Sequence, residues 1–352
     1  MILTHPATIR PVDRNCVIGI DLGGTNVRAG AFYEDGSAAG QSFSNPSNAQ
    51  QGTEAILVAV AKTAHEAAEA AQMKPTSIGI AIPGHVDDDT GIVLWSPNFG
   101  EEVNGVFTSW RNVVVREPLS KLIDLPIHMG NDANLAALGE YRFGSGKNSA
   151  RCLVMLTLGT GVGGGVVMAS SSVQGKATGS LVLLGGNKGG AELGHTVINY
   201  QGPECTSGEY GSLEGYMGRD AIIRRTQHRL GRGRESILNS LVSGDLSKLT
   251  PKHLSIAADQ GDDVAIEVYQ EIGTMLGVCI GNCINIFAPD VVAIGGQVAK
   301  AGDWLLGPAR KAARNIGIPS LFGDATILVA EQIEDAGMLG GASLALHAMS
   351  GA

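Results

Sequence analysis

The chain has 352 residues, enough for two domains with substantial cores, and its content of 44% apolar and 17% charged residues is typical of a soluble globular protein. A formal net charge of −9 argues against a nucleic-acid-binding surface, and we identify no apolar run long enough to span a bilayer. The first 15 residues contain no hydrophobic signal core and leave no room for a DNA-binding helix-turn-helix, and the five cysteines form an odd, scattered set. We therefore expect a cytoplasmic protein with reduced thiols.

The first third of the chain predicts a hairpin followed by alternating helices and strands. An apolar run at 16–20 and an alternating pattern at 27–33 flank a glycine-rich turn that runs from Asp21 to Asn26. The elements expected next are a helix at 53–72, a strand at 77–82 ending in Pro83 and Gly84, a loop at 95–105 centred on Asn98, and a short helix at 118–125.

Asn131 and Asp132 lie at a predicted corner between a strand and a helix. An apolar strand at 125–129 precedes them, and a helix with apolar periodicity begins near residue 135. A helix start offers unpaired N–H groups and a partly positive field, so either side chain could serve only as an N-cap. A carboxylate at this corner is equally suited to act as a catalytic base, and the local pattern leaves both interpretations open.

A second hairpin follows, with a strand at 152–158, a glycine-rich turn at 159–165 and a return strand at 166–168. One constant offset aligns it with the first hairpin, Cys16 with Cys152 and Gly23 with Gly159, which indicates a weak internal repeat of two related halves. The remaining predicted elements are a Gly/Ser-rich loop at 170–190, helices at about 213–228, 235–243, 251–258 and 261–287, a strand at 291–294 closing in Gly295 and Gly296, a helix at 304–315, a strand at 326–330 and a helix at 336–348. This order predicts an α/β protein with mixed sheets.

The glycine-rich turns are candidates for phosphate binding. Gly159, Gly161 and Gly164 match a dinucleotide-binding fingerprint, but a strand follows where that motif requires a helix, and the first acidic residue, Glu192, lies too far along the chain. We reject that interpretation, and no P-loop motif is present in the sequence. Backbone N–H groups and threonine hydroxyls at two hairpin tips can still hold phosphate, and the first tip carries an Asp that could face Mg²⁺. The pattern favours a nucleotide held between two halves.

These motifs resemble those of a known superfamily. The stretch from Asp21 to Asn26 is similar to the first phosphate motif of the actin/hexokinase/Hsp70 superfamily, residues 158–161 to the second, and residues 292–296 to the adenosine motif. Residues 131–134, the pair Glu192 and His195, and the segment 205–214 narrow the resemblance to the ROK family of sugar kinases and repressors, of the bacterial glucokinase type. The resemblance runs from about residue 17 to the end of the sequence.

The resemblance implies two RNase H-like (actin/hexokinase-type) domains, with mixed sheets flanked by helices and a cleft between them. The smaller N-terminal domain would comprise 1–130 plus 336–352 and carry the first phosphate loop. The larger C-terminal domain would comprise 131–335 and carry the second phosphate loop, the adenosine motif and the sugar-binding segment.

The resemblance also implies a role for each matching residue. Asp132 would be the catalytic base and would also contact the sugar, and Asp21 would help to place Mg²⁺ through water or phosphate. The other implied sugar ligands are Gly84, Asn98, Asn131, Glu192, His195 and Glu214. The implied nucleotide-binding residues are Asp21, Gly23, Gly24, Thr25, Asn26, Thr160, Gly161, Gly295 and Gly296.

One departure from the family concerns zinc. Members with a structural zinc carry the pattern C-x-C-G-x-x-G-C-x-E, with a histidine ten residues before its first cysteine. His195 and Cys205 keep this spacing, but Ser207 and Ser212 replace the other two cysteines. Hydroxyls are poor zinc ligands beside thiolates, and two remaining ligands cannot fill a tetrahedral site. We expect no structural zinc, and we expect hydrogen bonds from the two serines to hold the turn.

The expected activity is ATP- and Mg²⁺-dependent phosphorylation of a hexose hydroxyl, with glucose converted to glucose 6-phosphate. The alternatives are a kinase for another sugar, such as N-acetylmannosamine, N-acetylglucosamine, allose or fructose, or a sugar-responsive regulator that lacks its DNA-binding domain. The expected partners are the hexose and ATP, with no nucleic acid and no membrane. We also expect a homodimer or a higher homo-oligomer.

Overall fold

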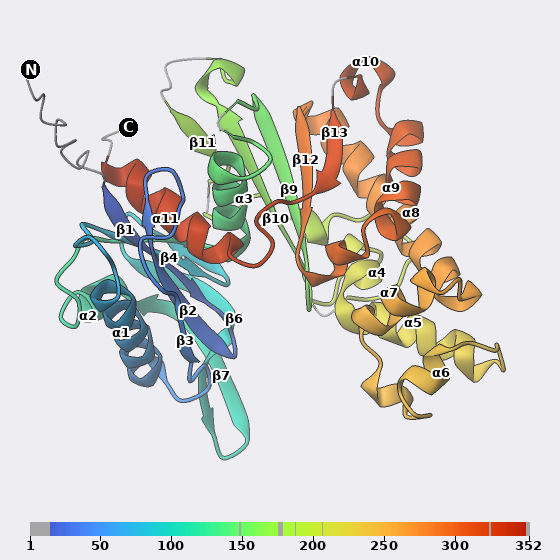
Figure 1. Cartoon of the computed structure of the whole chain (residues 1–352), viewed down its shortest axis with the longest axis horizontal. Helices are drawn as coiled ribbons and strands as arrows, with labels where there is room; N and C mark the ends of the chain where they lie inside the picture. The colour runs from blue at the N-terminus through green and yellow to red at the C-terminus, as the bar shows by residue number, and fades with distance from the viewer. Residues whose placement is uncertain are drawn as a thin grey trace, which may run out of the picture.

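Two five-stranded sheets of the same topology form the framework of the protein (Figure 1). A computed structural model describes residues 15–147, 149–174, 179–186, 188–205, 207–323 and 325–349, so the predictions for the first 14 residues lie outside it. The strands of the first sheet, in spatial order, are β3 (Phe43–Pro46), β2 (Asn26–Tyr33), β1 (Cys16–Leu22), β4 (Ile78–Ile82) and β8 (Ile127–Asn131). Those of the second are β11 (Ser180–Val182), β10 (Val162–Ala169), β9 (Cys152–Leu158), β12 (Val291–Gly295) and β13 (Thr326–Val329).

The two sheets confirm the internal repeat. In each sheet three antiparallel strands continue into two parallel ones, so both are mixed. When Cys16 is aligned with Cys152, the bounds of β1 and β2 coincide residue for residue with those of β9 and β10. The predicted α/β class with mixed sheets and flanking helices is correct.

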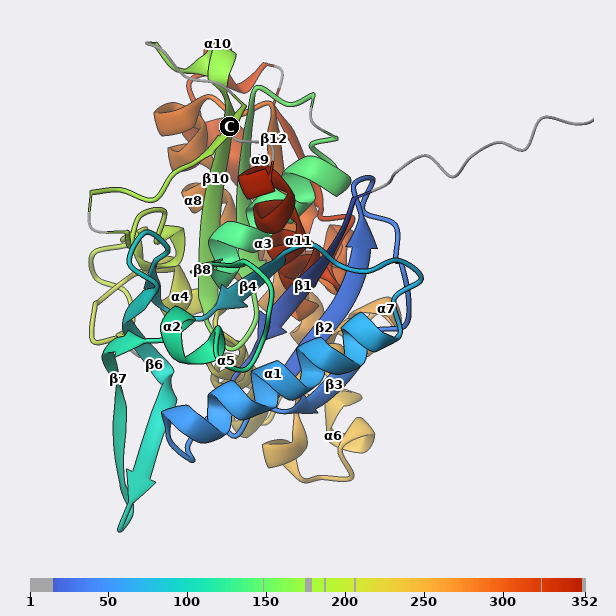
Figure 2. The same ribbon diagram turned by 90° about the vertical axis from the view of Figure 1, so that its left-hand side faces the viewer.

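The helices cover the sheets from three directions. In the first half, α1 (Thr53–Glu69) packs on β1, β2 and β3, beside the short α2 (Arg116–Leu119) (Figure 2). Between the two sheets lie α3 (Asp132–Phe143) and α11 (Ala336–Met349), which also pack against each other (Figure 1). The outer side of the second sheet carries α4 (Leu213–Met217), α5 (Arg219–Gly231), α6 (Leu238–Leu241), α7 (Pro251–Asp259), α8 (Asp263–Phe287), α9 (Asp303–Ile316) and α10 (Pro319–Phe322).

A third sheet corrects the predicted loop at 95–105. Its strands are β5 (His85–Asp87), β6 (Ile92–Val103) and β7 (Val106–Val114), and the β6–β7 hairpin projects from the body of the protein (Figure 2). Asn98 therefore lies in a strand, next to the buried Phe99, whose ring centroid is 5.2 Å from that of Trp110. This aromatic packing stabilises a hairpin in which the β6–β7 register shifts between Ser96 and Gly100.

The predicted turn at 159–165 and loop at 170–190 also need correction. The return strand β10 begins at Val162, so three consecutive glycines belong to the strand. A Cβ atom on Gly165 would lie 2.5 Å from the Cβ of Ala137 on α3, and one on Gly163 would lie 2.7 Å from the Cβ of Ala133, so these two glycines allow the helix to approach the strand closely. The 170–190 region contains β11, although part of that region lies outside the described residues.

The remaining helix predictions differ from the structure mainly at glycines and at helix ends. The helix predicted at 213–228 is two helices, α4 and α5, because Gly218 adopts extended backbone between them, and the one predicted at 235–243 shrinks to α6. The short helix predicted at 118–125 is instead α2, which ends at Leu119. Predicted bounds elsewhere are off by a few residues, as for α1, which ends at Glu69.

Helix α8 corrects the expectation that no apolar run could span a bilayer. By length and composition it is the one helix in the described part of the chain that could do so, with 61% of its most apolar window buried. Ile272, Leu276 and Ile280 on this helix belong to the core that packs against the second sheet. We interpret α8 as the central core helix of the second half.

Helix α11 lies on the first sheet with no side chains between the two backbones at the crossing. A Cβ atom on Gly79 of β4 would overlap the carbonyl oxygen of Gly341, and one on Gly19 of β1 would overlap that of Met338. The same helix meets α3 at Gly139, where a Cβ atom would lie 2.8 Å from the amide nitrogen of Gly340. The chain thus returns from the second sheet to complete the first half.

We predict that Gly79→Ala destabilises the protein by about 3 kcal/mol or more, because overpacking at a backbone contact cannot be relieved by side-chain rotation. Gly307→Ala on α9 is the matched control, since a Cβ atom at this position would have open space within 4 Å. The control should stabilise the helix by about 0.5–1 kcal/mol. Urea denaturation measures both, and equal stability of Gly79→Ala and the wild-type protein would contradict the close packing of α11.

Candidate active site

Asn131 and Asp132 lie at the junction of β8 and α3, as the sequence predicted. Asn131 is the N-cap of α3: its Oδ1 accepts a hydrogen bond of 2.9 Å from the amide of Asn134. Its Nδ2 donates to the carbonyl oxygen of Gly84 at 2.9 Å, so it also fixes the turn after β4. Asp132 is the first residue of the helix, and its Oδ1 accepts from the amide of Ala133 at 2.9 Å.

The carboxylate of Asp132 is poised to exchange a proton near neutral pH. Part of its surface is accessible, but it lies deep among protein atoms, and this loss of solvation raises its pKa to about 6. The hydrogen bond from Ala133 acts in the opposite direction, while the negative charges of Asp21 and Glu192 raise the pKa further. Two other predicted site residues, Asp21 and Glu192, therefore raise the pKa of Asp132 from other elements of the fold.

Asp21 stands at the end of β1, where the first glycine loop begins. Burial raises its pKa, the positive charge of Arg28 lowers it, and Asp335 raises it again. The loop is tight, with the amide of Gly23 donating to the carbonyl oxygen of Asn26 at 2.9 Å. The loop residues Gly24, Thr25 and Asn26 are exposed, and a Cβ atom on Gly24 would lie 3.9 Å from that of Asn98.

The second glycine loop joins β9 to β10 and lies beside the predicted adenosine motif. The amide of Gly159 donates to the carbonyl oxygen of Gly161 at 3.0 Å, and Thr160 is exposed at the tip. A Cβ atom on Gly296 would overlap the carbonyl oxygen of Leu158, so the end of β12, where Gly295 lies, abuts the end of β9. The structure brings these predicted nucleotide-binding residues together.

Glu214 and Glu192 approach the site from the second half. Glu214, in the first turn of α4, accepts a hydrogen bond of 3.0 Å from the amide of Val162, directly after the second glycine loop. Glu192 precedes the short helix η2 (Leu193–His195), and its Oε1 lies 3.6 Å from Nε2 of His85 on β5. His85 was not among the residues predicted from the sequence, although its position immediately after Gly84 was a usable signal.

His195 faces the segment in which the family zinc pattern is altered. His195 and Cys205, together with Glu214, offer donor atoms that all lie within 4.8 Å of one another. The thiol of Cys205 donates to Oε2 of Glu209 at 2.9 Å, and this Oε2 also lies 3.6 Å from Nδ1 of His195. The sequence predicted only two remaining donor residues, His195 and Cys205, but the carboxylates of Glu209 and Glu214 also lie close to them.

These residues still do not fit a structural zinc site. Ser207 is exposed, and the buried Ser212 uses its hydroxyl as the N-cap of α4, accepting from the amide of Gly215 at 3.4 Å. Glu214 already holds the second glycine loop, and the thiol of Cys205 is engaged with Glu209. A four-thiolate or His-Cys₃ arrangement is therefore absent from this segment as the structure describes it.

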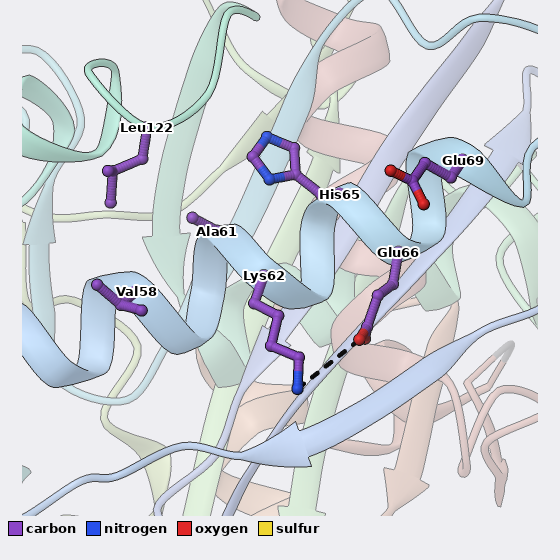
Figure 3. A pocket seen from close by; sticks show the side chains of 7 residues that line it. All are labelled: Val58, Ala61, Lys62, His65, Glu66, Glu69 and Leu122. Carbon is purple, nitrogen blue, oxygen red and sulfur yellow. Dashed lines mark ion pairs between the residues drawn. The ribbon is translucent and has the colours of Figure 1, made fainter.

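A hollow of about 400 Å³ lies away from all these residues, on the outer face of α1 (Figure 3). Val58 and Ala61 line it from the helix and Leu122 from the segment after α2, while Lys62 pairs with Glu66 along its edge. It contains none of the predicted site residues, so the candidate site is defined by the converging loops.

Comparisons with known proteins show which proteins the chain is similar to in sequence and in fold. Residues 17–348 match the model of the ROK family. The chain is 34% identical over 335 residues to a glucokinase of Thermotoga maritima, an alignment covering 95% of this chain and 98% of the relative. A crystal structure of a ROK family glucokinase from Streptomyces griseus, in complex with glucose and AMPPNP, aligns with a TM-score of 0.77 and 30% identity over 95% of this chain and all of that one. A ROK family transcriptional regulator homologous to the E. coli Mlc protein aligns with a TM-score of 0.78 and 25% identity, over 94% of this chain and 77% of that one.

We predict that the purified protein carries no stoichiometric zinc, because hydroxyls have replaced two thiolates and the remaining donors hold one another. Elemental analysis should find well under one zinc per chain, and a zinc-selective chelator should leave activity unchanged when Mg²⁺ is resupplied. The double variant Ser207→Cys/Ser212→Cys is the positive control and should acquire zinc. One zinc per chain in the wild-type protein would contradict the prediction and identify Glu209 and Glu214 as recruited ligands.

Proposed function

The chain belongs to the ROK family, and we propose that it transfers the γ-phosphoryl group of ATP to a hydroxyl of glucose. The observation that carries this proposal is the electrostatic action of Asp21, which precedes the first glycine loop, and of Glu192 on the carboxylate of Asp132. The Asp132 carboxylate has a pKa of about 6, and the residues at the tips of the glycine loops are exposed. Such a carboxylate is suited to deprotonate a hydroxyl beside a polyphosphate that backbone N–H groups hold.

In the proposed mechanism Asp132 is the general base. Phosphoryl transfer requires the attacking hydroxyl to be aligned with the γ-phosphorus and to lose its proton as the new P–O bond forms. The Asp132 carboxylate accepts that proton, and a pKa of about 6 keeps it ionised at pH 7 yet basic enough to act. Its backbone is fixed by the N-cap hydrogen bond of Asn131, so the base is held in place before the sugar arrives.

The proposed sugar ligands supply both donors and acceptors for hydroxyl groups. Asn131 and Gly84 come from the first half, with Asn98 near the first loop. Glu192 and His195, with Glu214, come from the second half, so the bound sugar would contact both. This set is the proposed sugar site.

The proposed nucleotide site uses the two glycine loops and the end of β12. Backbone N–H groups and hydroxyls would hold the phosphates, and Gly295 with Gly296 would line the adenosine. The half-buried carboxylate of Asp21 is an oxygen ligand of the kind that Mg²⁺ uses, and it would hold the ion through water or phosphate. The bound ion would neutralise charge on the phosphates. The residues of the two loops are Gly23, Gly24, Thr25, Asn26, Thr160 and Gly161.

We further propose that the enzyme works in the cytoplasm as a homodimer or higher homo-oligomer and binds neither nucleic acid nor membrane. The location and the lack of nucleic-acid and membrane binding rest on the composition and net charge of the sequence. The alternatives are a kinase for another hexose or amino sugar and a sugar-responsive regulator without phosphotransfer.

We predict that an assay of ADP release across a sugar panel gives the highest kcat/KM for glucose. The panel includes mannose, fructose, allose, N-acetylglucosamine and N-acetylmannosamine, and glucose should lead by about tenfold or more, as a site built to bind hydroxyls discriminates against altered ones. A higher kcat/KM for another sugar would reassign the substrate. Tight sugar binding without turnover would favour the regulator.

We predict that Asp132→Asn lowers kcat by roughly two orders of magnitude or more while sugar affinity is largely kept, because the shape of the residue remains and the proton acceptor is lost. We do not expect the lower kcat of Asp132→Asn to result from unfolding of the variant. The raised pKa means that the folded protein binds this proton more tightly than the unfolded chain, so the ionised carboxylate destabilises the fold above about pH 6 and less so as the pH falls. The variant should therefore be as stable as the wild type at pH 7, or more stable by about 1–2 kcal/mol.

The pH profile provides the second measurement of this assignment. Activity requires the ionised base, so kcat/KM of the wild type should be constant above the pKa and fall as the pH drops below about 6. The residual activity of Asp132→Asn should lack this fall. Near-normal turnover in the variant, or an unchanged acidic limb, would remove Asp132 from the role of base.

A further inference from the structure

Two short segments from opposite halves of the protein face each other beside the candidate sugar site. One is 85–89, which contains β5 and the turn after it, and the other is 188–192, which leads to η2. Nζ of Lys188 lies 2.7 Å from Oδ2 of Asp89 and 3.6 Å from Oδ1 of Asp87. His85 and Glu192 approach to 3.6 Å at the other end of the contact. The two segments thus run in opposite directions and meet at both ends.

A glycine makes this contact possible. A Cβ atom on Gly189 would lie 3.0 Å from both Cε1 and Nε2 of the His85 ring. Gly189 is not in the left-handed region, so its backbone conformation is open to alanine and only the imidazole stands in the way. The same imidazole packs edge-to-face with the ring of Trp95, with ring centroids 5.5 Å apart. His85 is therefore held between Trp95 and the 188–192 segment.

The 85–89 segment is anchored to the strand that carries the catalytic corner. The carboxylate of Asp88 accepts a hydrogen bond of 2.8 Å from the amide of Met129 on β8 and pairs with Arg116. Oδ2 of Asp87 also accepts from Thr90 at 2.9 Å. Because β8 ends in Asn131, this side of the contact has a fixed position relative to Asp132.

The facing segment is held in a backbone conformation that needs support. Lys188 and Ala191 have φ angles of 62° and 63°, the left-handed region that side chains other than glycine rarely adopt. Gly190 between them donates to the carbonyl oxygen of Leu184 at 2.8 Å. The ion pairs of Lys188 supply interactions outside the segment that favour this conformation.

We propose that His85 and Lys188 are positioning residues for Glu192. Lys188 fastens the 188–192 segment to Asp87 and Asp89, and this brings Glu192 against His85 on the fixed side of the site. The role of Glu192 in binding the sugar rests on the function proposed above. Neither Lys188 nor His85 takes part in proton or phosphoryl transfer, so their effect falls on sugar binding.

The first test removes the fastening charge. Lys188→Met should raise KM for the sugar about three- to fivefold, the range expected for exposed ion pairs, with kcat changed less than about twofold. Raising NaCl from about 50 to about 500 mM should increase KM of the wild type through screening and leave KM of Lys188→Met nearly constant. Lys121→Met, which removes a lysine paired with Glu117 on α2, is the matched control and should behave as the wild type.

The second test uses the contact between Gly189 and His85. Gly189→Ala should raise KM by a similar factor because its methyl group displaces the imidazole, and His85→Ala should do so because Glu192 loses its neighbour. In the double variant the added methyl group meets no ring, so the two effects should be strongly non-additive. His85→Gln, which retains a hydrogen-bond donor, should restore part of the affinity.

The outcomes separate this proposal from the proposed function. If the wild type phosphorylates no sugar, the function is wrong, and calorimetric titration with glucose then decides whether Lys188 affects binding. If the wild type is active and Lys188→Met shows the KM and salt dependence of the wild type, the fastening role is wrong. Additive effects of Gly189→Ala and His85→Ala would show that the two residues act separately and would overturn the role of His85.

Discussion

The whole arrangement depends on a backbone contact that excludes side chains, where α11 crosses the first sheet and α3. Glycines on both sides allow this crossing, and a Cβ atom on Gly340 would overlap the backbone of Leu135. The contact also reaches the candidate site, because a Cβ atom on Gly337 would lie 2.5 Å from Cγ of Asp21. The start of α11, with its unpaired N–H groups and positive field, therefore lies beside the carboxylate that we assign to Mg²⁺.

A buried carboxylate connects this crossing to the second half. Glu140 on α3 is fully buried and accepts hydrogen bonds from the amides of Glu331 and Gln332, at 2.8 and 3.0 Å, and from the hydroxyl of Ser145 at 2.6 Å. Several donors offset the large cost of removing a charge from water. One helix thus presents the proposed base at its N-terminus and fixes, near its C-terminus, the segment from which the chain enters α11.

The sequence allowed prediction of those features that depend on local pattern. The strand at 152–158 was predicted with its observed bounds, and the corner at Asn131 and Asp132 was recognised from a strand followed by a helix. The glycines at 163–165 misled the prediction because their small size serves packing against distant parts of the chain: Gly163 and Gly165 pack against α3, and Gly164 against Ala191 and Leu193. Lys188 was missed for a related reason, because its partners Asp87 and Asp89 lie about 100 residues away and no local spacing signals such a contact. His85 and Glu209 were missed although each had a local signal: His85 follows Gly84 directly, and Glu209 lies four residues after Cys205.

The return of α11 to the first sheet has a consequence for synthesis on the ribosome. Strand β1 is made more than 300 residues before α11, so the first sheet lacks one covering layer until α11 has been synthesised. At about 5–20 residues per second, this wait lasts on the order of 15–60 s. During that time the nascent first half exposes the apolar face formed by β1 and β4, a state in which chains are prone to aggregate or recruit chaperones.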